Sequence, residues 1–262
     1  MKVADKIVVV TGGAEGIGRG LCERFAREGA RHVVVVDIDG AKAEAVAKAV
    51  GGTAFAADVS READVVRVIE ETEAKIGPID LFCSNAGIGG KGEAFDNAAS
   101  ATNEVWQHVW EVNLMAHVFA ARSLLPRMIA RGGGYFLNTA SAAGLLTQVG
   151  SAVYSVTKHA AVAFAESLAI THRDHGIRVS VLCPQAVDTP LLRAAGEGTQ
   201  NVDGVLSPAE VADAVVEALD RESFLVLPHQ QVLGYMQNKT SNYDRWIGGM
   251  VKLRRRFLPG AN

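Results

Sequence analysis

The sequence predicts a single α/β domain: a doubly wound parallel sheet of about seven strands with helices on both faces. Short, almost continuously apolar segments alternate along the chain with longer segments of helical periodicity. Strands of this kind need cover on both faces, which a parallel sheet receives from its connecting helices. A glycine-rich turn joins the first strand to the first helix, so we expect a Rossmann-like fold.

The strands and helices can be placed along the chain in order. The expected strands cover residues 7–10, 33–36, 53–57, 81–84, 135–138, 179–182 and 224–227. A long helical stretch is expected over 103–128, and a later helix should begin at Ser207, where Pro208 and Glu210 complete a capping box. No linker or repeat divides residues 1–262, and ligands of such a domain bind at the carboxyl ends of the strands.

Composition narrows the functional classes. The chain has 262 residues, 48% of them hydrophobic, and a net charge of −3. These values suit one soluble domain with a large core and provide no basic excess for binding nucleic acid. No apolar run approaches the roughly 18 residues that span a bilayer, and the first strand begins too early for a signal peptide. We therefore expect a cytoplasmic protein.

The three cysteines predict neither disulfides nor a metal site. Cys22, Cys83 and Cys183 are far apart, lie in apolar segments and form no C-x-x-C pair. The histidines also show no ligand spacing. Buried, reduced thiols are the expected state.

The turn from Thr11 to Gly18 indicates a phosphate site. Its glycines allow a sharp turn and let a pyrophosphate approach the N-terminus of the following helix, where free N–H groups favour negative charge. The glycine spacing differs from G-x-G-x-x-G. Asp37 ends the second strand about 20 residues later, where an acid would accept a hydrogen bond from an adenosine ribose. The alternative is a tight turn with an acid at a strand end.

Tyr154 and Lys158 form the clearest chemical pair. A four-residue spacing places them side by side on a helix. A neighbouring ammonium favours phenolate, so we expect Lys158 to lower the pKa of Tyr154 and to make it useful as a general acid or base. The alternative is a pair on a solvated helix face.

Several motifs together resemble one family. The run Thr11-Gly12-x-x-x-Gly16-x-Gly18, the run Asn85-Ala86-Gly87, Ser141, Tyr154-x-x-x-Lys158 and Pro184 are similar in order and spacing to the short-chain dehydrogenases/reductases. The resemblance covers about residues 6–227. It implies an NAD-dependent oxidoreductase that interconverts an alcohol and a ketone by hydride transfer.

The resemblance also assigns catalytic roles. Ser141 would hydrogen-bond the substrate oxygen, Tyr154 would exchange a proton with it, and Lys158 would also hold the nicotinamide ribose. Asn113 would hold a water that links Lys158 to solvent. A buried asparagine needs a polar partner, and a core amide satisfied by backbone is the alternative for Asn113.

NAD is the expected cofactor. Asp37 should repel a 2′-phosphate, Glu15 stands where relatives that prefer NADP often carry a basic residue, and Ile38 is uncharged. Asp58 and Val59 would contact adenine, although Asp58 could be an ordinary helix cap. The expected cofactor residues are Gly12, Glu15, Gly16, Ile17, Gly18, Asp37, Ile38, Asp58, Val59, Asn85, Ala86, Gly87, Tyr154, Lys158, Pro184, Val187 and Thr189.

Two positions depart from the family pattern. Ser84 replaces the usual asparagine before Asn85, and Gln185 replaces the usual glycine after Pro184. Gln185 could alter the backbone near the nicotinamide or touch the substrate. The mostly apolar candidate substrate residues are Ala143, Gln148, Gln185, Leu191 and Leu192. They favour a hydrophobic secondary alcohol or its ketone.

Two segments complete the expectations. Residues 190–206 are rich in glycine and are interpreted as a mobile lid over the substrate. In the tail over 241–262, Trp246, Met250, Leu253 and Phe257 recur at helical spacing among basic residues. Packing against the core or a neighbouring subunit is the favoured interpretation, and contact with a membrane surface is the alternative. The resemblance also implies a homo-oligomer, a tetramer or a dimer.

Two other functions remain open at this point. An NADPH-dependent 3-ketoacyl reductase would share the fold and the catalytic residues, but Asp37 and Glu15 argue against it. A non-catalytic dinucleotide-binding sensor would share the fold alone. Such proteins often lose the Tyr-Lys pair or the serine, and this chain has all three residues.

Overall fold

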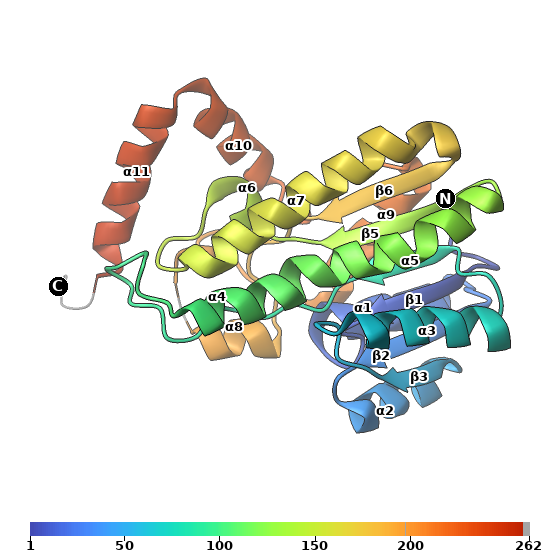
Figure 1. The fold of residues 1–262 in the computed structure, drawn as a ribbon. Helices are drawn as coiled ribbons and strands as arrows, with labels where there is room; N and C mark the ends of the chain where they lie inside the picture. The colour runs from blue at the N-terminus through green and yellow to red at the C-terminus, as the bar shows by residue number, and fades with distance from the viewer. Residues whose placement is uncertain (197, 259–262) are drawn as a thin grey trace.

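The structure, a computed structural model, describes residues 1–196 and 198–258. The strands are β1 Ile7–Thr11, β2 His32–Asp37, β3 Thr53–Ala56, β4 Leu81–Ser84, β5 Gly134–Thr139, β6 Ile177–Leu182 and β7 Leu225–Val226. They form one parallel sheet in the order β3-β2-β1-β4-β5-β6-β7 (Figure 1). All seven predicted strands and the doubly wound fold are confirmed.

Helices connect the strands. The helices that follow β1 to β4 are α1 Gly16–Arg27, α2 Gly40–Val50, α3 Glu62–Lys75 and α4 Asn103–Trp110, continued by a π-helical turn Glu111–Met115 and α5 Ala116–Ala130. The later helices are α6 Ala143–Leu146, α7 Ala152–His172, α8 Pro190–Ala195, α9 Pro208–Arg221, α10 Gln231–Ser241 and α11 Tyr243–Arg256, with 3₁₀ turns at Arg173–His175 and Thr199–Asn201.

Successive side chains of each strand point to opposite faces of the sheet and form two hydrophobic cores, one on each face. Residues such as Val9 and Phe82 pack on one face of the sheet in a cluster with residues of α3, α5 and α7. Their neighbours, such as Val8 and Leu81, pack on the other face with residues of α1 and α9. Each fully buried large side chain contributes about 1.5–3 kcal/mol of transfer free energy. The two covered faces leave the carboxyl edge of the sheet as the place for a ligand.

The predicted long helix over 103–128 is confirmed with one irregularity. Its π-helical turn has Asn113 at the centre, and the side chain of Asn113 is fully buried. A π turn inserts one extra residue into the helix and is frequently found at functional sites. The predicted start of α9 is also confirmed, because the Ser207 hydroxyl accepts from the Glu210 N–H and the Glu210 carboxylate accepts from the Ser207 N–H.

The predicted lid, residues 190–206, and the predicted tail both contain helical segments. The segment 190–206 contains α8 and the 3₁₀ turn at Thr199–Asn201, while residue 197 lies outside the described residues. In the tail, α11 stands away from the sheet, beside the carboxyl edge, and residues 259–262 lie outside the described residues (Figure 1). No helix in the described parts of the chain is both long and apolar enough to cross a membrane.

Gly18 offers a test of the close packing beneath the glycine turn. A Cβ at this position would lie 2.0 Å from the carbonyl oxygen of Gly12, which is backbone and has little freedom to move. Gly18→Ala should therefore destabilise the protein by about 1–3 kcal/mol and weaken NAD binding, measured by thermal denaturation and by titration with NAD.

Gly234 in α10 is the matched control. A Cβ there would meet nothing within 4 Å, and an alanine inside a helix is favoured over glycine by about 0.5–1 kcal/mol. Gly234→Ala should raise the melting temperature. Equal melting temperatures for Gly18→Ala and the parent would show that the turn is not as tightly packed as the structure indicates.

Candidate active site

One cavity of about 1060 Å³ lies at the carboxyl edge of the sheet. Its walls come from the turns that follow β1 to β6 and from α7, α8, α10 and α11. It brings together all the predicted catalytic, cofactor and substrate residues except Gly18 and Asn113. Gly18 lies beneath the glycine turn, and Asn113 lies behind Gly87.

The glycine turn has the features of a dinucleotide site. Gly12 and Gly16 have positive φ angles of 62° and 53°, which L side chains rarely adopt. Among the described residues, no side chain caps the N-terminus of α1, so its first N–H groups remain available for an anion. Asp37 is fixed beside them, because its carboxylate accepts from the N–H groups of Ala14 and Asp39 at 3.1 Å each. These residues fit the pyrophosphate and the adenosine ribose of a nicotinamide dinucleotide.

Two further polar contacts lie at this end of the cavity. The Lys42 ammonium lies 2.9 Å from a Glu15 carboxylate oxygen and 3.5 Å from a carboxylate oxygen of Asp39. Lys42 was not among the predicted residues, because only the folded loop brings it to Glu15. Asp58 lines the cavity and accepts from the Ser60 N–H at 3.0 Å, so it is not the N-cap of α3.

Asn85 ties three strand ends together. Its backbone N–H donates to the Thr11 hydroxyl at 2.9 Å, and its side-chain amide donates to the Thr11 carbonyl oxygen at 3.0 Å. Its side-chain oxygen accepts from the Thr139 hydroxyl at 3.1 Å. Asn85 therefore holds the ends of β1, β4 and β5 in register, in addition to lining the cavity.

Lys158 is the buried cation of the site. Its side chain is 2% exposed and its Nζ donates to the Thr139 carbonyl oxygen at 3.0 Å. Burial lowers the pKa of the ammonium from 10.5 to about 8, because a charge is costly to remove from water. The same Nζ lies 5.6 Å from the centre of the Tyr154 ring.

The expected effect of Lys158 on Tyr154 is corrected by the structure. The pKa of Tyr154 is raised rather than lowered, and burial is the largest cause, only partly offset by the Ser141 hydroxyl. Loss of water around the phenol disfavours phenolate more than the neighbouring groups favour it. Spacing along the helix correctly predicted that the pair would be close, but the surroundings decide the direction of the pKa shift.

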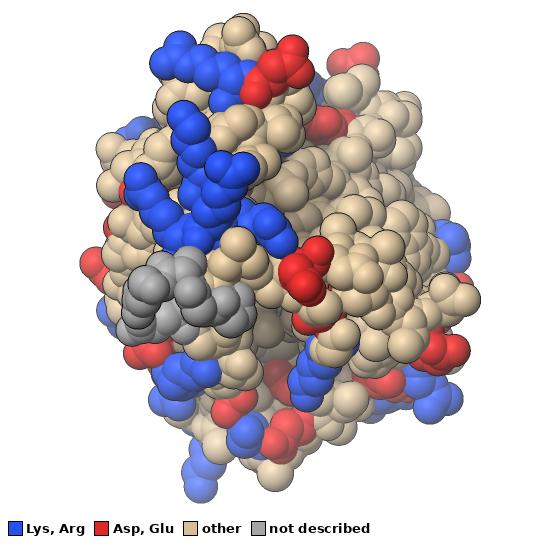
Figure 2. Space-filling view, turned by 90° about the vertical axis from the view of Figure 1, so that its left-hand side faces the viewer, with Lys and Arg blue, Asp and Glu red and all other residues tan. Residues whose placement is uncertain are grey.

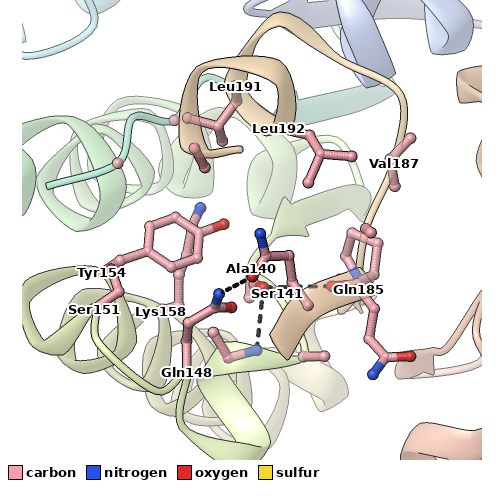
Figure 3. Close-up of a pocket in the computed structure, with 18 of the residues that line it drawn as sticks. Ala140, Ser141, Gln148, Ser151, Tyr154, Lys158, Gln185, Val187, Leu191 and Leu192 are labelled. Atoms are coloured by element: carbon pink, nitrogen blue, oxygen red, sulfur yellow. Dashed lines mark hydrogen bonds between the residues drawn. The ribbon is translucent and has the colours of Figure 1, made fainter. Parts of the chain in front are cut away.

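Ser141 and Tyr154 face the same cavity (Figure 3). The Ser141 hydroxyl accepts from the Ala143 N–H at 3.1 Å and donates to the Pro184 carbonyl oxygen at 3.4 Å. These bonds fix the hydroxyl oxygen between the end of β5 and the end of β6. A substrate oxygen between Ser141 and Tyr154 could therefore meet two hydroxyl groups.

Asn113 is satisfied by its own surroundings. Its side-chain oxygen accepts from the Ile88 N–H at 2.9 Å, and its amide donates to the Ile88 carbonyl oxygen at 2.9 Å and to the Thr157 hydroxyl at 3.2 Å. This is the core amide that the sequence left open as an alternative. The predicted water relay through Asn113 stays a prediction.

The substrate end contains two hydrogen bonds that the sequence did not reveal. Gln148 Nε2 donates to Gln200 Oε1 at 2.6 Å, which ties the segment 190–206 to the loop after α6. The Gln185 N–H donates to His229 Nδ1 at 3.2 Å, and the Gln185 side chain extends away from Tyr154 (Figure 3). Gln185 thus lines the cavity without pointing at the phenol.

His117 is a second unpredicted neighbour of the site. Its ring is buried, and neither ring nitrogen has a hydrogen-bond partner among the described residues. Burial, assisted by the charge of Lys158, lowers its pKa to about 3. His117 therefore stays neutral near neutral pH, and Lys158 keeps the only charge of the two.

α11 forms the outer wall of the cavity. Arg245, Trp246, Met250, Leu253 and Arg256 line it. Trp246 also packs against the cluster of Ala142, Leu146 and Val232, which confirms packing on the body of the protein. The apolar face of α11 is turned toward the cavity. The alternative, contact with a membrane surface, stays a prediction.

The thiols lie in the core, as expected. Cys22, Cys83 and Cys183 are free and buried. Burial raises the pKa of Cys22 and of Cys183 to about 12 and that of Cys83 as well, so none is reactive.

Because the Lys158 ammonium is buried, we expect that replacing Lys158 with an apolar residue raises the free energy of unfolding. Because the pKa of Lys158 is about 8 in the folded chain and 10.5 without burial, the unfolded chain binds more protons between these pH values. The cost of burying the charge is therefore present at pH 7 and disappears as pH rises toward 10.5. Lys158→Met should raise the free energy of unfolding at pH 7 by about 1–3 kcal/mol, after the loss of one hydrogen bond.

Denaturant unfolding at pH 7 and pH 10 measures this difference, which should shrink at the higher pH. Lys48→Met is the control, because Lys48 is an exposed residue of α2 whose ammonium stays in water in the folded chain. It should show no gain. A loss of stability in Lys158→Met at pH 7 would contradict the argument.

Comparisons with known proteins agree on the family. A family model described as short chain dehydrogenase matches residues 6–200. The 1-deoxy-11-beta-hydroxypentalenate dehydrogenase of Streptomyces exfoliatus is 39% identical over 236 residues, which cover 86% of this chain and 83% of that protein.

Solved structures agree as well. A short chain dehydrogenase/reductase from Burkholderia phymatum in complex with NAD has a TM-score of 0.81 at 25% identity, covering 93% of this chain and 96% of that one. A 3-ketoacyl-(acyl-carrier-protein) reductase from Brucella melitensis complexed with NADH has a TM-score of 0.79 at 31% identity, covering 87% and 99%. This chain belongs to the short-chain dehydrogenase/reductase family of oxidoreductases.

Proposed function

We propose that the protein is an NAD-dependent oxidoreductase that interconverts a hydrophobic secondary alcohol and its ketone. The observation that carries this proposal is the meeting of Ser141, Tyr154 and Lys158 in one cavity that continues to the glycine turn and Asp37. The Streptomyces relative is named for a hydroxylated substrate, which agrees with this reaction class.

Ser141, Tyr154 and Lys158 each have a separate role in the proposed alcohol oxidation. Ser141 holds the substrate oxygen, and the phenolate form of Tyr154 accepts the hydroxyl proton. Lys158 supplies a positive charge beneath the phenol and holds the nicotinamide ribose. The bound nicotinamide ring supplies the hydride chemistry. Because burial raises the pKa of Tyr154, oxidation should be favoured by alkaline pH and ketone reduction by lower pH.

NAD is favoured over NADP by charge. Asp37 and Glu15 line the cavity at the adenosine end, where a 2′-phosphate would meet two carboxylates. Lys42 lies nearby but is paired with Glu15 and Asp39, so its charge is largely neutralised. Ile38 adds no positive charge. The complexes of the two structural neighbours contain NAD and NADH.

Ketoacyl reduction is the second candidate. The Brucella melitensis relative is named for this activity and is complexed with NADH. Asp37 and Glu15 argue against an NADPH-dependent reductase, but a preference for NAD does not by itself exclude ketoacyl reduction. Reduction of a 3-ketoacyl thioester faster than of simple ketones would favour this candidate. The sensor alternative has no support, since all three catalytic side chains line the cavity. A cytoplasmic location and a homotetramer or homodimer stay predictions.

Turnover should depend on the phenol of Tyr154. With NAD and a panel of aromatic, alicyclic and steroid secondary alcohols, NADH formation should fall by about 10²–10⁴-fold in Tyr154→Phe, because the phenol is the group proposed to accept the hydroxyl proton. Tyr135→Phe is the matched control. The Tyr135 hydroxyl bonds Ser180 inside the sheet at 2.8 Å and does not line the cavity.

Binding of NAD to Tyr135→Phe should match the parent by calorimetry, and Tyr154→Phe should still bind NAD. Unchanged turnover in Tyr154→Phe would remove the tyrosine from the mechanism. NAD binding without turnover of any alcohol or ketoacyl substrate would instead favour the sensor alternative.

Cofactor choice should depend on Asp37. Asp37→Asn keeps an oxygen that can accept from Ala14 and Asp39 but removes the charge that repels a 2′-phosphate. The ratio of kcat/KM for NADP over NAD should rise about ten- to a hundredfold. Glu44→Gln is the control, because Glu44 is an exposed acid of α2 that does not line the cavity. A parent enzyme that prefers NADP would contradict the assignment of NAD.

A further inference from the structure

The charges that line the cavity are segregated. Its acidic lining residues among those described are Glu15, Asp37 and Asp58, and all three follow β1, β2 or β3 at the adenosine end. At the opposite end, beyond Tyr154, the charged lining residues are Arg245 and Arg256 of α11. A cavity of this kind favours a neutral reacting group in the middle and a negative group at the α11 end.

The two arginines share a helix face with apolar side chains. Arg245 and Arg256 are eleven residues apart, three helical turns, so they point to the same side of α11. Trp246, Met250 and Leu253 lie on that side between them and also line the cavity. The wall formed by α11 is therefore apolar in its centre and positive at two points along its length.

Both guanidinium groups are available to a ligand. Both side chains are exposed, and none of the ion pairs among residues 1–196 and 198–258 involves either of them. Figure 2 shows Lys and Arg side chains gathered on this side of the molecule, next to a recess in the surface. Arg254, by contrast, is stacked over the Phe95 ring at 5.8 Å.

We propose that α11 carries an anion subsite and that the substrate is an amphiphilic hydroxy acid. Its secondary alcohol reacts at Tyr154 and its apolar frame lies along Trp246 and Leu253. Its carboxylate is held by whichever of Arg245 and Arg256 the length of that frame reaches, because eleven residues of helix separate the two by about 16 Å. Guanidinium groups suit this role because they bind carboxylates with two parallel hydrogen bonds. The inference deepens the proposed oxidation of a secondary alcohol and rests on it.

The test compares matched acids and esters. The probes are (ω−1)-hydroxy fatty acids from 7-hydroxyoctanoate to 13-hydroxytetradecanoate and their methyl esters, each oxidised with NAD. Once the chain is long enough for its carboxylate to reach an arginine of α11, the parent should show a higher kcat/KM for the acid than for the matching ester. In Arg245→Gln or Arg256→Gln the acid-over-ester ratio should fall about tenfold, mainly through KM, for the chain lengths whose carboxylate reaches the substituted arginine, because a charge-assisted contact is lost.

Arg255→Gln is the matched control, because Arg255 is an exposed neighbour on α11 that does not line the cavity. It should keep the parent ratio. Equal losses for positions 245, 255 and 256 would indicate a general charge effect, such as attraction to an anionic membrane, and would overturn the subsite. Equal kcat/KM for acids and esters in the parent would overturn it as well.

A binding measurement separates this inference from the proposed function. Decanoate should quench the fluorescence of Trp246 in the parent, more weakly at high salt, whereas methyl decanoate should show no salt dependence. Trp246→Phe identifies the signal, and Arg245→Gln should weaken decanoate binding. If no alcohol is oxidised but decanoate binds in this way, the proposed oxidation fails and the subsite stands. If alcohols and esters are oxidised but decanoate does not bind, the subsite alone fails.

Discussion

The buried ammonium of Lys158, held by the Thr139 carbonyl oxygen, is the interaction on which the site depends. Two glycines pack closely against Lys158, one against its backbone and one against its side chain. A Cβ at Gly144 would lie 2.5 Å from the Lys158 carbonyl oxygen, and a Cβ at Gly87 would lie 3.1 Å from its Nζ. Gly144 in α6 and Gly87 after β4 can approach α7 this closely because they have no side chain. The backbone and the side chain of Lys158 therefore limit how closely α6 and the end of β4 pack against α7.

The parts of the fold that were predictable are those encoded locally. Seven apolar segments became the seven strands, and the central ones, such as β1 and β4, are buried on both faces. The capping residues at Ser207 and Glu210 act within one helical turn. The glycine turn and the Tyr154–Lys158 spacing were predictable for the same reason. In each case, neighbours along the chain determine the geometry.

The parts that were not predictable depend on residues far apart in sequence. Whether Tyr154 is more or less acidic than a free phenol is decided by how much of the chain excludes water from it, and spacing carries no such information. The π turn at Asn113 and the contact of Gln148 with Gln200 also arise only in the folded chain. The amphipathic pattern of α11 was visible, but not the cavity that its face would line.

The proposed function assigns the chemistry to residues inside the family match, whereas the proposed anion subsite lies on α11, beyond it. The family match ends at residue 200, after Ser141, Tyr154 and Lys158, whereas α10 and α11 lie beyond it. These helices meet the catalytic body through side-chain contacts such as Tyr235 with Asp203, at 2.9 Å, and through the packing of Trp246. Under these two proposals, substitutions on the cavity face of α11 change which ligand is bound without moving Ser141, Tyr154 or Lys158. An oxidoreductase built this way can acquire a new substrate through one wall of its cavity while the buried cation and its neighbours remain unchanged.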